Sequence, residues 1–196
     1  MTQFIAHRIN TLEALKALPK HFGVELDLRD SKQELILQHD PFTPGEKFAD
    51  YLAQYQHGTM ILNIKSERIE HKVLELLQEY KINDYFFLDS SIPMIYLLSK
   101  QGEKKSAVRF SEIESIETVM LMADKVDWVW VDCFNKLPID QQSYQRLKQA
   151  GLKLCLVSPE LQGRAEDIAP YKEYLDQQGI VFDAICTKVH NIEAWQ

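Results

Sequence analysis

The sequence predicts an α/β protein with a parallel sheet, and three observations support this fold class. Short apolar, strand-like segments alternate with amphipathic, helix-like segments along the whole chain. Eight strand-like segments can be counted, and nearly every one ends in a polar or charged residue. Alternation of this kind is typical of βα units that build a parallel sheet. Eight units fit one compact (β/α)8 TIM barrel domain spanning residues 1–196, and an open doubly wound sheet is the alternative.

The predicted strands are short apolar runs bounded by polar or turn-forming residues. They are Gln3–His7, Val24–Arg29, Met60–Lys65, Tyr85–Asp89, Ser106–Phe110, Trp128–Cys133, Lys153–Ser158 and Phe182–Thr187. Alternate residues of a strand share one face, so Glu25, Asp27 and Arg29 are expected to point the same way.

The predicted helices carry apolar residues at helical spacing. They cover Asn10–Leu18, Gly45–Tyr55, Glu67–Tyr80, Ile92–Ser99, Ser111–Met122, Asp140–Ala150 and Glu166–Gln178. Ser111 followed by Glu114 predicts a capping box at the start of the fifth helix. Gly151 and Gly179 stand just beyond two helices, where C-terminal caps are expected. The last segment, Val189–Gln196, can form at most a short eighth helix.

Composition excludes several functional classes. A net charge of −7 argues against a nucleic-acid binder that works through a basic surface. The chain has no apolar run long enough for a transmembrane helix, and its N-terminus lacks the pattern of a secretory signal. The three cysteines, Cys133, Cys155 and Cys186, lie in or beside apolar strands and are expected to be buried thiols. We therefore expect a cytoplasmic protein.

Chemically active residue types follow the first apolar segments. His7-Arg8 closes the first strand, Glu25 and Asp27 lie in the second, and His39-Asp40 follows another apolar run. Two carboxylates on one strand face repel each other unless a cation lies between them, and hard divalent cations take carboxylate oxygens as ligands. Nearby histidines can transfer protons near neutral pH. The stretch therefore predicts a metal site with acid–base groups beside it.

The order of these motifs resembles the glycerophosphodiester phosphodiesterase family, which belongs to the phosphatidylinositol-specific phospholipase C-like superfamily. That family has His-Arg-Gly at the first strand, then Glu-Asn-Thr, then Glu-x-Asp on the second strand and then His-Asp. This chain has His7-Arg8-Ile9, Asn10-Thr11, Glu25-Leu26-Asp27 and His39-Asp40 in the same order. Ile9 replaces the glycine, and the loop between the first two motifs is missing. The resemblance favours the barrel over the open sheet, with a short or absent last helix.

The resemblance also implies a metal site for Mg²⁺ or Ca²⁺. Glu25 and Asp27 are the expected ligands. The family's third carboxylate comes from a Glu-x-Lys pattern, for which this chain has Asn63-Ile64-Lys65. Asn63 offers a neutral carbonyl oxygen, so the metal is expected to bind more weakly. Asp132, at the end of the sixth strand, is a candidate for restoring the missing charge.

The remaining roles follow from the same resemblance. His7 is the expected general base and His39 the expected general acid. Arg8 and Lys65 are expected to hold the phosphate of the substrate. Arg109 is a candidate for binding a second anionic group, and its alternative is a salt bridge with Glu112 or Asp89.

These expectations lead to three hypotheses about function. The first is a metal-dependent phosphodiesterase of lipid metabolism that hydrolyses or cyclises a small glycerophosphodiester-like substrate. The second is a catalytically impaired barrel that only binds a phosphorylated ligand or partner, which the trimmed first loop and Asn63 favour. The third is a sugar-phosphate isomerase or aldolase in which Lys65 forms a Schiff base with the substrate. We rank it last because Glu25 and Asp27 would raise the pKa of Lys65.

Overall fold

Apolar strands of this sequence assemble into one sheet in the computed structural model, which describes residues 1–196. All eight predicted strands are present, each within about two residues of its expected ends. The ten strands are β1 (Gln3–Ala6), β2 (Gly23–Ser31), β3 (Glu34–Leu37), β4 (Glu46–Lys47), β5 (Met60–Ile64), β6 (Tyr85–Leu88), β7 (Ala107–Phe110), β8 (Trp128–Val131), β9 (Lys153–Val157) and β10 (Ala184–Thr187).

The sheet is curled, and its parallel strands follow the chain in order. β1 lies between β10 and β2, and β2 continues through β5 to β6. On the other side β10, β9, β8 and β7 are neighbours. β6 and β7 meet through one bridge, Phe87 with Ser106, and the amide of Phe87 donates to the carbonyl of Lys105 at 2.8 Å. We call this contact the β6–β7 seam.

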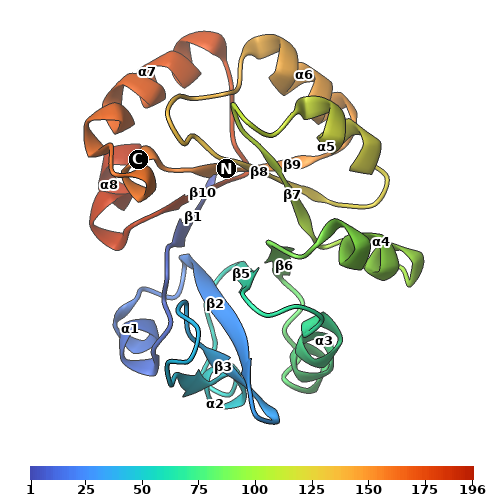
Figure 1. The fold of residues 1–196 in the computed structure, drawn as a ribbon. Helices are drawn as coiled ribbons and strands as arrows, with labels where there is room; N and C mark the ends of the chain where they lie inside the picture. The colour runs from blue at the N-terminus through green and yellow to red at the C-terminus, as the bar shows by residue number, and fades with distance from the viewer.

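Helices lie around the outside of the strands, as βα units require (Figure 1). They are α1 (Leu12–Ala17), α2 (Phe48–Leu52), α3 (Glu70–Glu79), α4 (Ile92–Lys100), α5 (Ile116–Met122), α6 (Gln141–Gln149), α7 (Ile168–Gln178) and α8 (Ile192–Trp195). The last is short, as predicted. Gly151 and Gly179 cap α6 and α7 with φ of 80° and 63°, which confirms those two predictions. No helix is both long and apolar enough to cross a bilayer.

The predicted start of the fifth helix is wrong. Ser111 and Glu114 do interact, since the Ser111 hydroxyl accepts from the amide of Glu114 at 3.1 Å. Their backbone atoms close a separate turn, however, and Ser115 is extended with φ −67° and ψ 140°. Ser115 is the N-cap of α5, and its hydroxyl accepts from the amide of Glu117. A capping sequence can thus close a turn without starting a helix.

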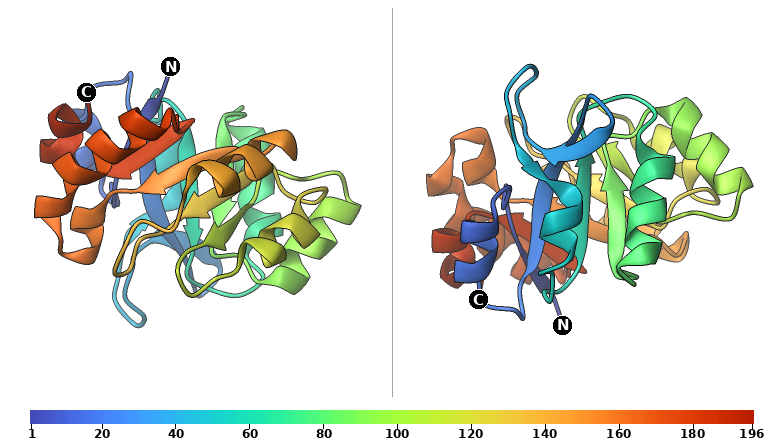
Figure 2. Two further views of the ribbon diagram at one scale, coloured as in Figure 1. Left: turned by 90° about the horizontal axis from the view of Figure 1, so that it is seen from above. Right: turned by 90° about the horizontal axis from the view of Figure 1, so that it is seen from below.

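A hairpin that the sequence did not predict extends the sheet. Leu35–Leu37 belongs to β3, which pairs antiparallel with the far end of β2, and β4 pairs with β3 in turn. The hairpin and the loop after it project at the end of the molecule opposite the N-terminus (Figure 2). This is the end at which the parallel strands finish, so the hairpin places the His39 loop beside those strand ends.

Apolar side chains fill the interior of the curled sheet. They come from every parallel strand except β2: Ile5, Ile61, Phe86, Leu88, Ala107, Trp128, Trp130, Cys155, Val157, Ala184 and Cys186. β2 lacks a member because its residues on this face are Glu25 and Asp27, which are in register with Ile61 and Asn63. The interior is therefore apolar at one end and charged at the other. All three cysteines are buried and free, as predicted.

Candidate active site at the carboxyl ends of the strands

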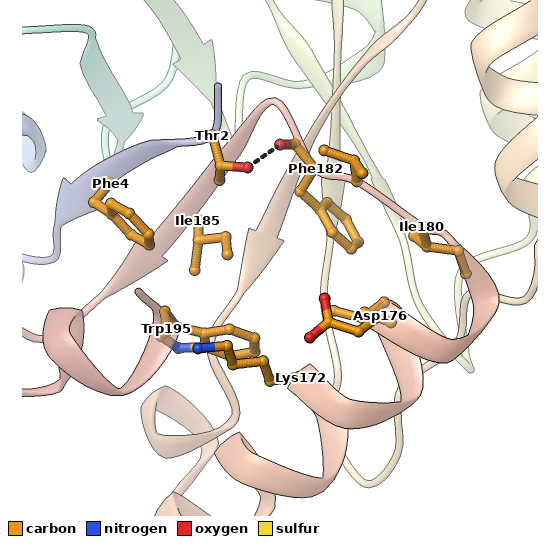
Figure 3. A pocket seen from close by; sticks show the side chains of 10 residues that line it. Thr2, Phe4, Lys172, Asp176, Ile180, Phe182, Ile185 and Trp195 are labelled. Carbon is orange, nitrogen blue, oxygen red and sulfur yellow. Dashed lines mark hydrogen bonds between the residues drawn. The ribbon is translucent and has the colours of Figure 1, made fainter.

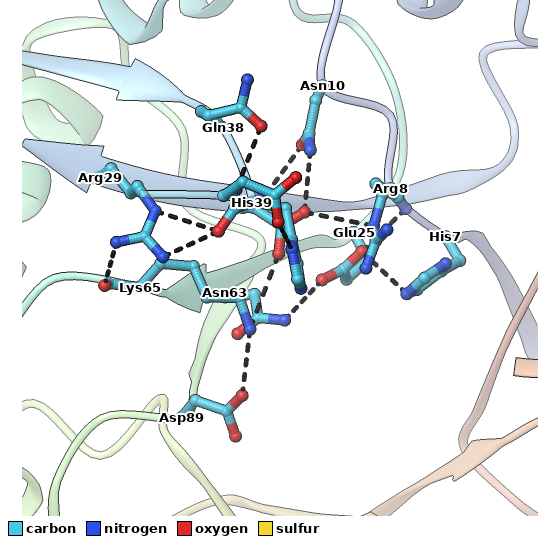
Figure 4. Close-up of polar contacts among 12 residues, drawn as sticks. His7, Arg8, Asn10, Glu25, Arg29, Gln38, His39, Asn63, Lys65 and Asp89 are labelled. Atoms are coloured by element: carbon cyan, nitrogen blue, oxygen red, sulfur yellow. Dashed lines mark hydrogen bonds and ion pairs between the residues drawn. The ribbon is translucent and has the colours of Figure 1, made fainter. Parts of the chain in front are cut away.

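His7 and Arg8 leave β1 and turn toward the carboxylates of β2. The backbone N–H of Arg8 donates to Glu25 Oε2 at 2.8 Å, and Arg8 Nε lies 3.6 Å from Asp27 Oδ2. His7 Nε2 lies 3.7 Å from Glu25 Oε2 (Figure 4). Arg8 has φ of 58°, a left-handed conformation that costs a non-glycine residue about 1–3 kcal/mol. That conformation aims the Arg8 amide at the buried carboxylate.

Burial and charge shift the pKa values of two of these groups in opposite directions. Burial, and next the charge of Asp27, raises the pKa of Glu25 to about 7, although hydrogen bonds from Asn63 and Arg8 oppose the change. Burial, and next the charge of Arg8, lowers the pKa of His7 to about 4. His7 is therefore neutral at pH 7 and has a lone pair that can accept a proton.

Asn10 holds Asp27 in place, a role that the sequence analysis missed. Its Nδ2 donates to Asp27 Oδ2 at 2.8 Å, and its Oδ1 accepts from the backbone amide of Asp27, also at 2.8 Å. This reciprocal pair fixes both the side chain and the backbone of Asp27. The motif Asn10-Thr11 was the available signal, but Thr11 caps α1 while Asn10 turns toward the site.

Asn63 and Lys65, at the end of β5, complete the surroundings of the two carboxylates. Asn63 Nδ2 donates to Glu25 Oε1 at 2.8 Å. Asn63 is 8% exposed, and its Oδ1 is buried with no hydrogen-bond partner. Lys65 Nζ lies 3.7 Å from Asp27 Oδ1 and donates to Asp89 Oδ2 at 3.4 Å. The amide thus places a free oxygen next to the carboxylate pair.

Arg29 anchors the loop that carries His39. Its guanidinium donates to the carbonyl of His39 at 3.0 and 2.8 Å and to the carbonyl of Lys65 at 2.9 Å. The ring of His39 is 2.8 Å from Asp40 through Nδ1. Asp40 therefore occupies one ring nitrogen, and Nε2 is the nitrogen that remains for a substrate.

A chain of ion pairs leads from Lys65 across the strand ends. Asp89, which follows β6, accepts from Arg109 Nε at 2.8 Å as well as from Lys65. Arg109 Nη1 then donates to Asp132 Oδ2 at 2.6 Å. Asp132 Oδ1 accepts from Gln162 and from the backbone of Cys133, both at 2.8 Å. Asp132 and Arg109 thus neutralise each other, and the structure does not bring Asp132 into the Glu25 and Asp27 pair.

Another buried carboxylate, outside the Glu25 and Asp27 pair, lies at the ends of β9 and β10. Glu160 accepts from the hydroxyl of Ser158 and, at 2.5 Å, from that of Thr187. The backbone amide of Lys188 donates to the same carboxylate at 3.0 Å. The sequence analysis did not single out Glu160. The available signal was a carboxylate two residues beyond the end of a predicted strand.

The structure therefore brings together most of the predicted site residues. They are His7, Arg8, Glu25, Asp27, Asn63 and Lys65, with the His39 loop held beside them by Arg29 (Figure 4). No group of three or more His, Cys, Asp or Glu side chains is arranged to hold a metal ion. The oxygen donors at this site are two carboxylates and one amide. Lys65 contacts two carboxylates, which does not suit a Schiff-base lysine.

A separate small cavity near the N-terminus has no part in this site. It measures about 130 Å³ and lies between β1, β10 and the helices α7 and α8. Its walls are mainly apolar and include Phe4, Phe182 and Trp195 (Figure 3). None of the predicted site residues lines it.

Solved structures of similar fold include two glycerophosphodiester phosphodiesterases. One from Agrobacterium tumefaciens strain C58 has a TM-score of 0.68 at 18% sequence identity, covering 95% of this chain and 96% of that one. One from Parabacteroides distasonis ATCC 8503 has a TM-score of 0.66 at 12% identity, covering 98% and 85%. The chain has the fold of these proteins. No family model matches the sequence, and no curated protein matches it.

Proposed function

We propose that this protein is a metal-dependent phosphodiesterase acting on a small glycerophosphodiester-like substrate. The observation that carries the proposal is the clustering of His7, Arg8, Glu25, Asp27 and Lys65 at the carboxyl ends of strands, on a scaffold shared with phosphodiesterases. Parallel α/β sheets place their active sites at this end. We also propose that the curled sheet is a complete (β/α)8 barrel and that residues 1–196 form one domain.

The oxygen donors fit a hard divalent cation. Glu25 and Asp27 supply charge, and the unpaired Oδ1 of Asn63 supplies a neutral ligand. Burial, and next the charge of Asp27, raises the pKa of Glu25, and a bound cation would offset both effects. A bound Mg²⁺ or Ca²⁺ would polarise a phosphoryl oxygen of the substrate. With only two formal charges, the site is expected to bind the ion weakly.

The cationic side chains are placed to hold the phosphate. Arg8 is half-exposed and Lys65 lies on the opposite side of Asp27. Both can donate to phosphoryl oxygens and offset the charge that grows in the transition state. Arg8 and Lys65 lie 3.6 and 3.7 Å from the carboxylate of Asp27, which is long for a hydrogen bond. Their N–H groups can therefore donate to a substrate oxygen instead.

The two histidines are assigned the proton transfers. His7, neutral because of its lowered pKa, takes a proton from the attacking hydroxyl. His39, oriented by Asp40 through Nδ1, gives a proton from Nε2 to the leaving alkoxide. The attacking hydroxyl belongs to water in hydrolysis and to the substrate in cyclisation. Each transfer contributes about 10²–10⁴-fold to the rate.

Metal-dependent turnover tests the proposal. Metal-free protein is assayed on a panel of glycerophosphodiesters, with Mg²⁺ or Ca²⁺ restored. Turnover should return with the ion, and His7→Ala should lower it by about 10²–10⁴-fold. His71→Ala is the control, since the side chain of His71 is exposed on α3 and is not among the site residues. Absence of turnover on every diester, or full activity of His7→Ala, would refute the assignment.

One observation favours a second candidate, a barrel that binds phosphate groups without catalysis. The Asn63 amide donates to Glu25 and the Lys65 ammonium lies beside Asp27, so both carboxylates have partners without a metal. In that case glycerol phosphate would bind equally well with Mg²⁺ and with a chelator, and no diester would be cleaved. Titration calorimetry under both conditions separates the two candidates.

A further inference from the structure

The β6–β7 seam opens into a cavity at the same end of the molecule as the candidate site. Beyond the bridge between Phe87 and Ser106 the two strands share no further pairing, whereas β7 and β8 pair over four residues. Beside this gap, the segment after β6, the strand β7 and the starts of α4 and α5 line a cavity of about 610 Å³. Small-molecule sites typically measure about 300–1,000 Å³.

Asp89 belongs both to this cavity and to the candidate active site. It lines the cavity, and it accepts from Lys65 Nζ at 3.4 Å, the same ammonium that lies 3.7 Å from Asp27 (Figure 4). The cavity therefore begins one side chain away from the groups proposed to hold the phosphate. On this geometry, a substituent on that phosphate would enter the cavity past Asp89.

The charged groups that line the cavity are paired within the protein. Asp89 binds Lys65 and Arg109, and Arg109 also binds Asp132. Glu114 accepts from the hydroxyl of Ser111 at 2.8 Å. A ligand in the cavity is thus not required to bring a charge, because none of these groups lacks a partner.

Five apolar residues and four hydroxyl-bearing residues form the remaining walls, and two of the apolar side chains are largely exposed. The hydroxyl-bearing residues are Ser90, Ser91, Ser115 and Thr118. The apolar residues are Ile92, Ile95, Ala107, Val108 and Ile113. Ile92 is 48% exposed and Ile113 is 74% exposed, although both stand beside a concave surface. Filling the cavity with hydrocarbon would remove these side chains from water, which is favourable in proportion to the area covered.

We infer that this cavity, which we call the seam pocket, binds an apolar alcohol substituent of the phosphodiester substrate. The inference rests on the proposed function for the position of the phosphate. It assigns to the substrate one polar glycerol arm and one alkyl-bearing arm that lies between α4 and α5. The enzyme then acts on amphiphilic diesters in preference to diesters of two small polar alcohols.

Binding tests the seam pocket without requiring catalysis. Octyl phosphate, kept below its micelle concentration, is compared with glycerol phosphate by titration calorimetry. Octyl phosphate should bind at least roughly tenfold more tightly. The variant Ile92→Ser/Ile113→Ser should abolish that preference. Leu121→Ser is the control, because Leu121 is 77% exposed on α5 but does not line the cavity. Equal affinities for the two phosphates, or an unchanged preference in the double variant, would overturn the inference.

Hydrolysis then separates the two proposals. A glycerophosphodiester with an octyl arm is compared with one whose second alcohol is also glycerol. The octyl diester should have the higher kcat/KM, and Ile92→Ser/Ile113→Ser should lower that value roughly tenfold while leaving the diglycerol compound unchanged. If octyl phosphate binds as expected but neither diester is cleaved, the phosphodiesterase assignment fails and the seam pocket stands. If both diesters are cleaved with equal kcat/KM, the seam pocket fails and the phosphodiesterase assignment stands.

Discussion

Replacing Asn10 by alanine is expected to destabilise the protein by about 2–4 kcal/mol. The side chain makes two hydrogen bonds of 2.8 Å with Asp27, one to its carboxylate and one from its backbone amide. A hydrogen bond to a charged group contributes about 1.5–3 kcal/mol, and a buried donor left unpaired costs about 1–3 kcal/mol. Asn10 is only half-buried, so water can recover part of the loss. The remainder is large beside a total stability of about 5–15 kcal/mol.

Urea unfolding followed by tryptophan fluorescence measures this loss. Asn83→Ala is the matched control, because Asn83 is exposed and its amide makes one bond of 3.3 Å to the carbonyl of Lys81. The control should unfold within about 0.5 kcal/mol of the natural protein. If Asn10→Ala were equally harmless, Asn10 would not hold Asp27 in solution, and the account of the site's rigidity would be wrong.

Three further substitutions probe the core, the proposed metal ligands and the ion-pair chain. Tyr51→Phe should cost about 1 kcal/mol in urea unfolding, because its buried hydroxyl donates to the carbonyl of Ile9 at 2.9 Å; no loss would mean that the carbonyl finds another donor. Asn63→Asp should tighten Mg²⁺ binding roughly tenfold in calorimetry, since it adds a charged oxygen ligand, and unchanged affinity would remove this side chain from the donor set. Burial opposes ionisation of Asp89, but the hydrogen bond and charge of Arg109 outweigh it and lower the pKa of Asp89. The stabilisation is therefore present above the unfolded pKa and lost as pH falls through the lower folded value. Asp89→Asn should thus destabilise the protein at neutral pH and have almost no effect at a pH below the folded pKa of Asp89. An equal effect at both pH values would contradict the pairing.

The parallel strands were predictable because their signals are local. Each is a short apolar run closed by a polar residue, and each lies between helices that have their own periodicity. Gly151 and Gly179 could be predicted as helix caps for the same reason, because the conformation of a capping residue depends on the residues next to it. Glu25 and Asp27 were readable as neighbours because a strand places alternate residues on one face.

Features that depend on distant partners escaped prediction. Asn10 holds Asp27, which lies 17 residues away in the sequence. Glu160 accepts a hydrogen bond from Thr187 of β10, which lies 27 residues away. The apolar run Leu35–Leu37 could not reveal that it would pair with the end of β2. The pairing of Asp132 could not be predicted for a related reason. A carboxylate at a strand end binds whichever cation lies closest in space, and here that cation is Arg109.

The seam between β6 and β7, with its single bridge, is also where we expect the lowest local stability in the sheet. Apolar residues of the helices and of the strands they pack on form two clusters. One has 22 buried residues between Ala6 and Leu98, and the other has 19 between Ile95 and Trp195. Backbone amides along the seam are therefore expected to exchange with solvent deuterium through small local openings, ahead of those in β1, β2 and β10. Deuterium uptake at Phe87 thus reports on how tightly the two halves of the protein are held together.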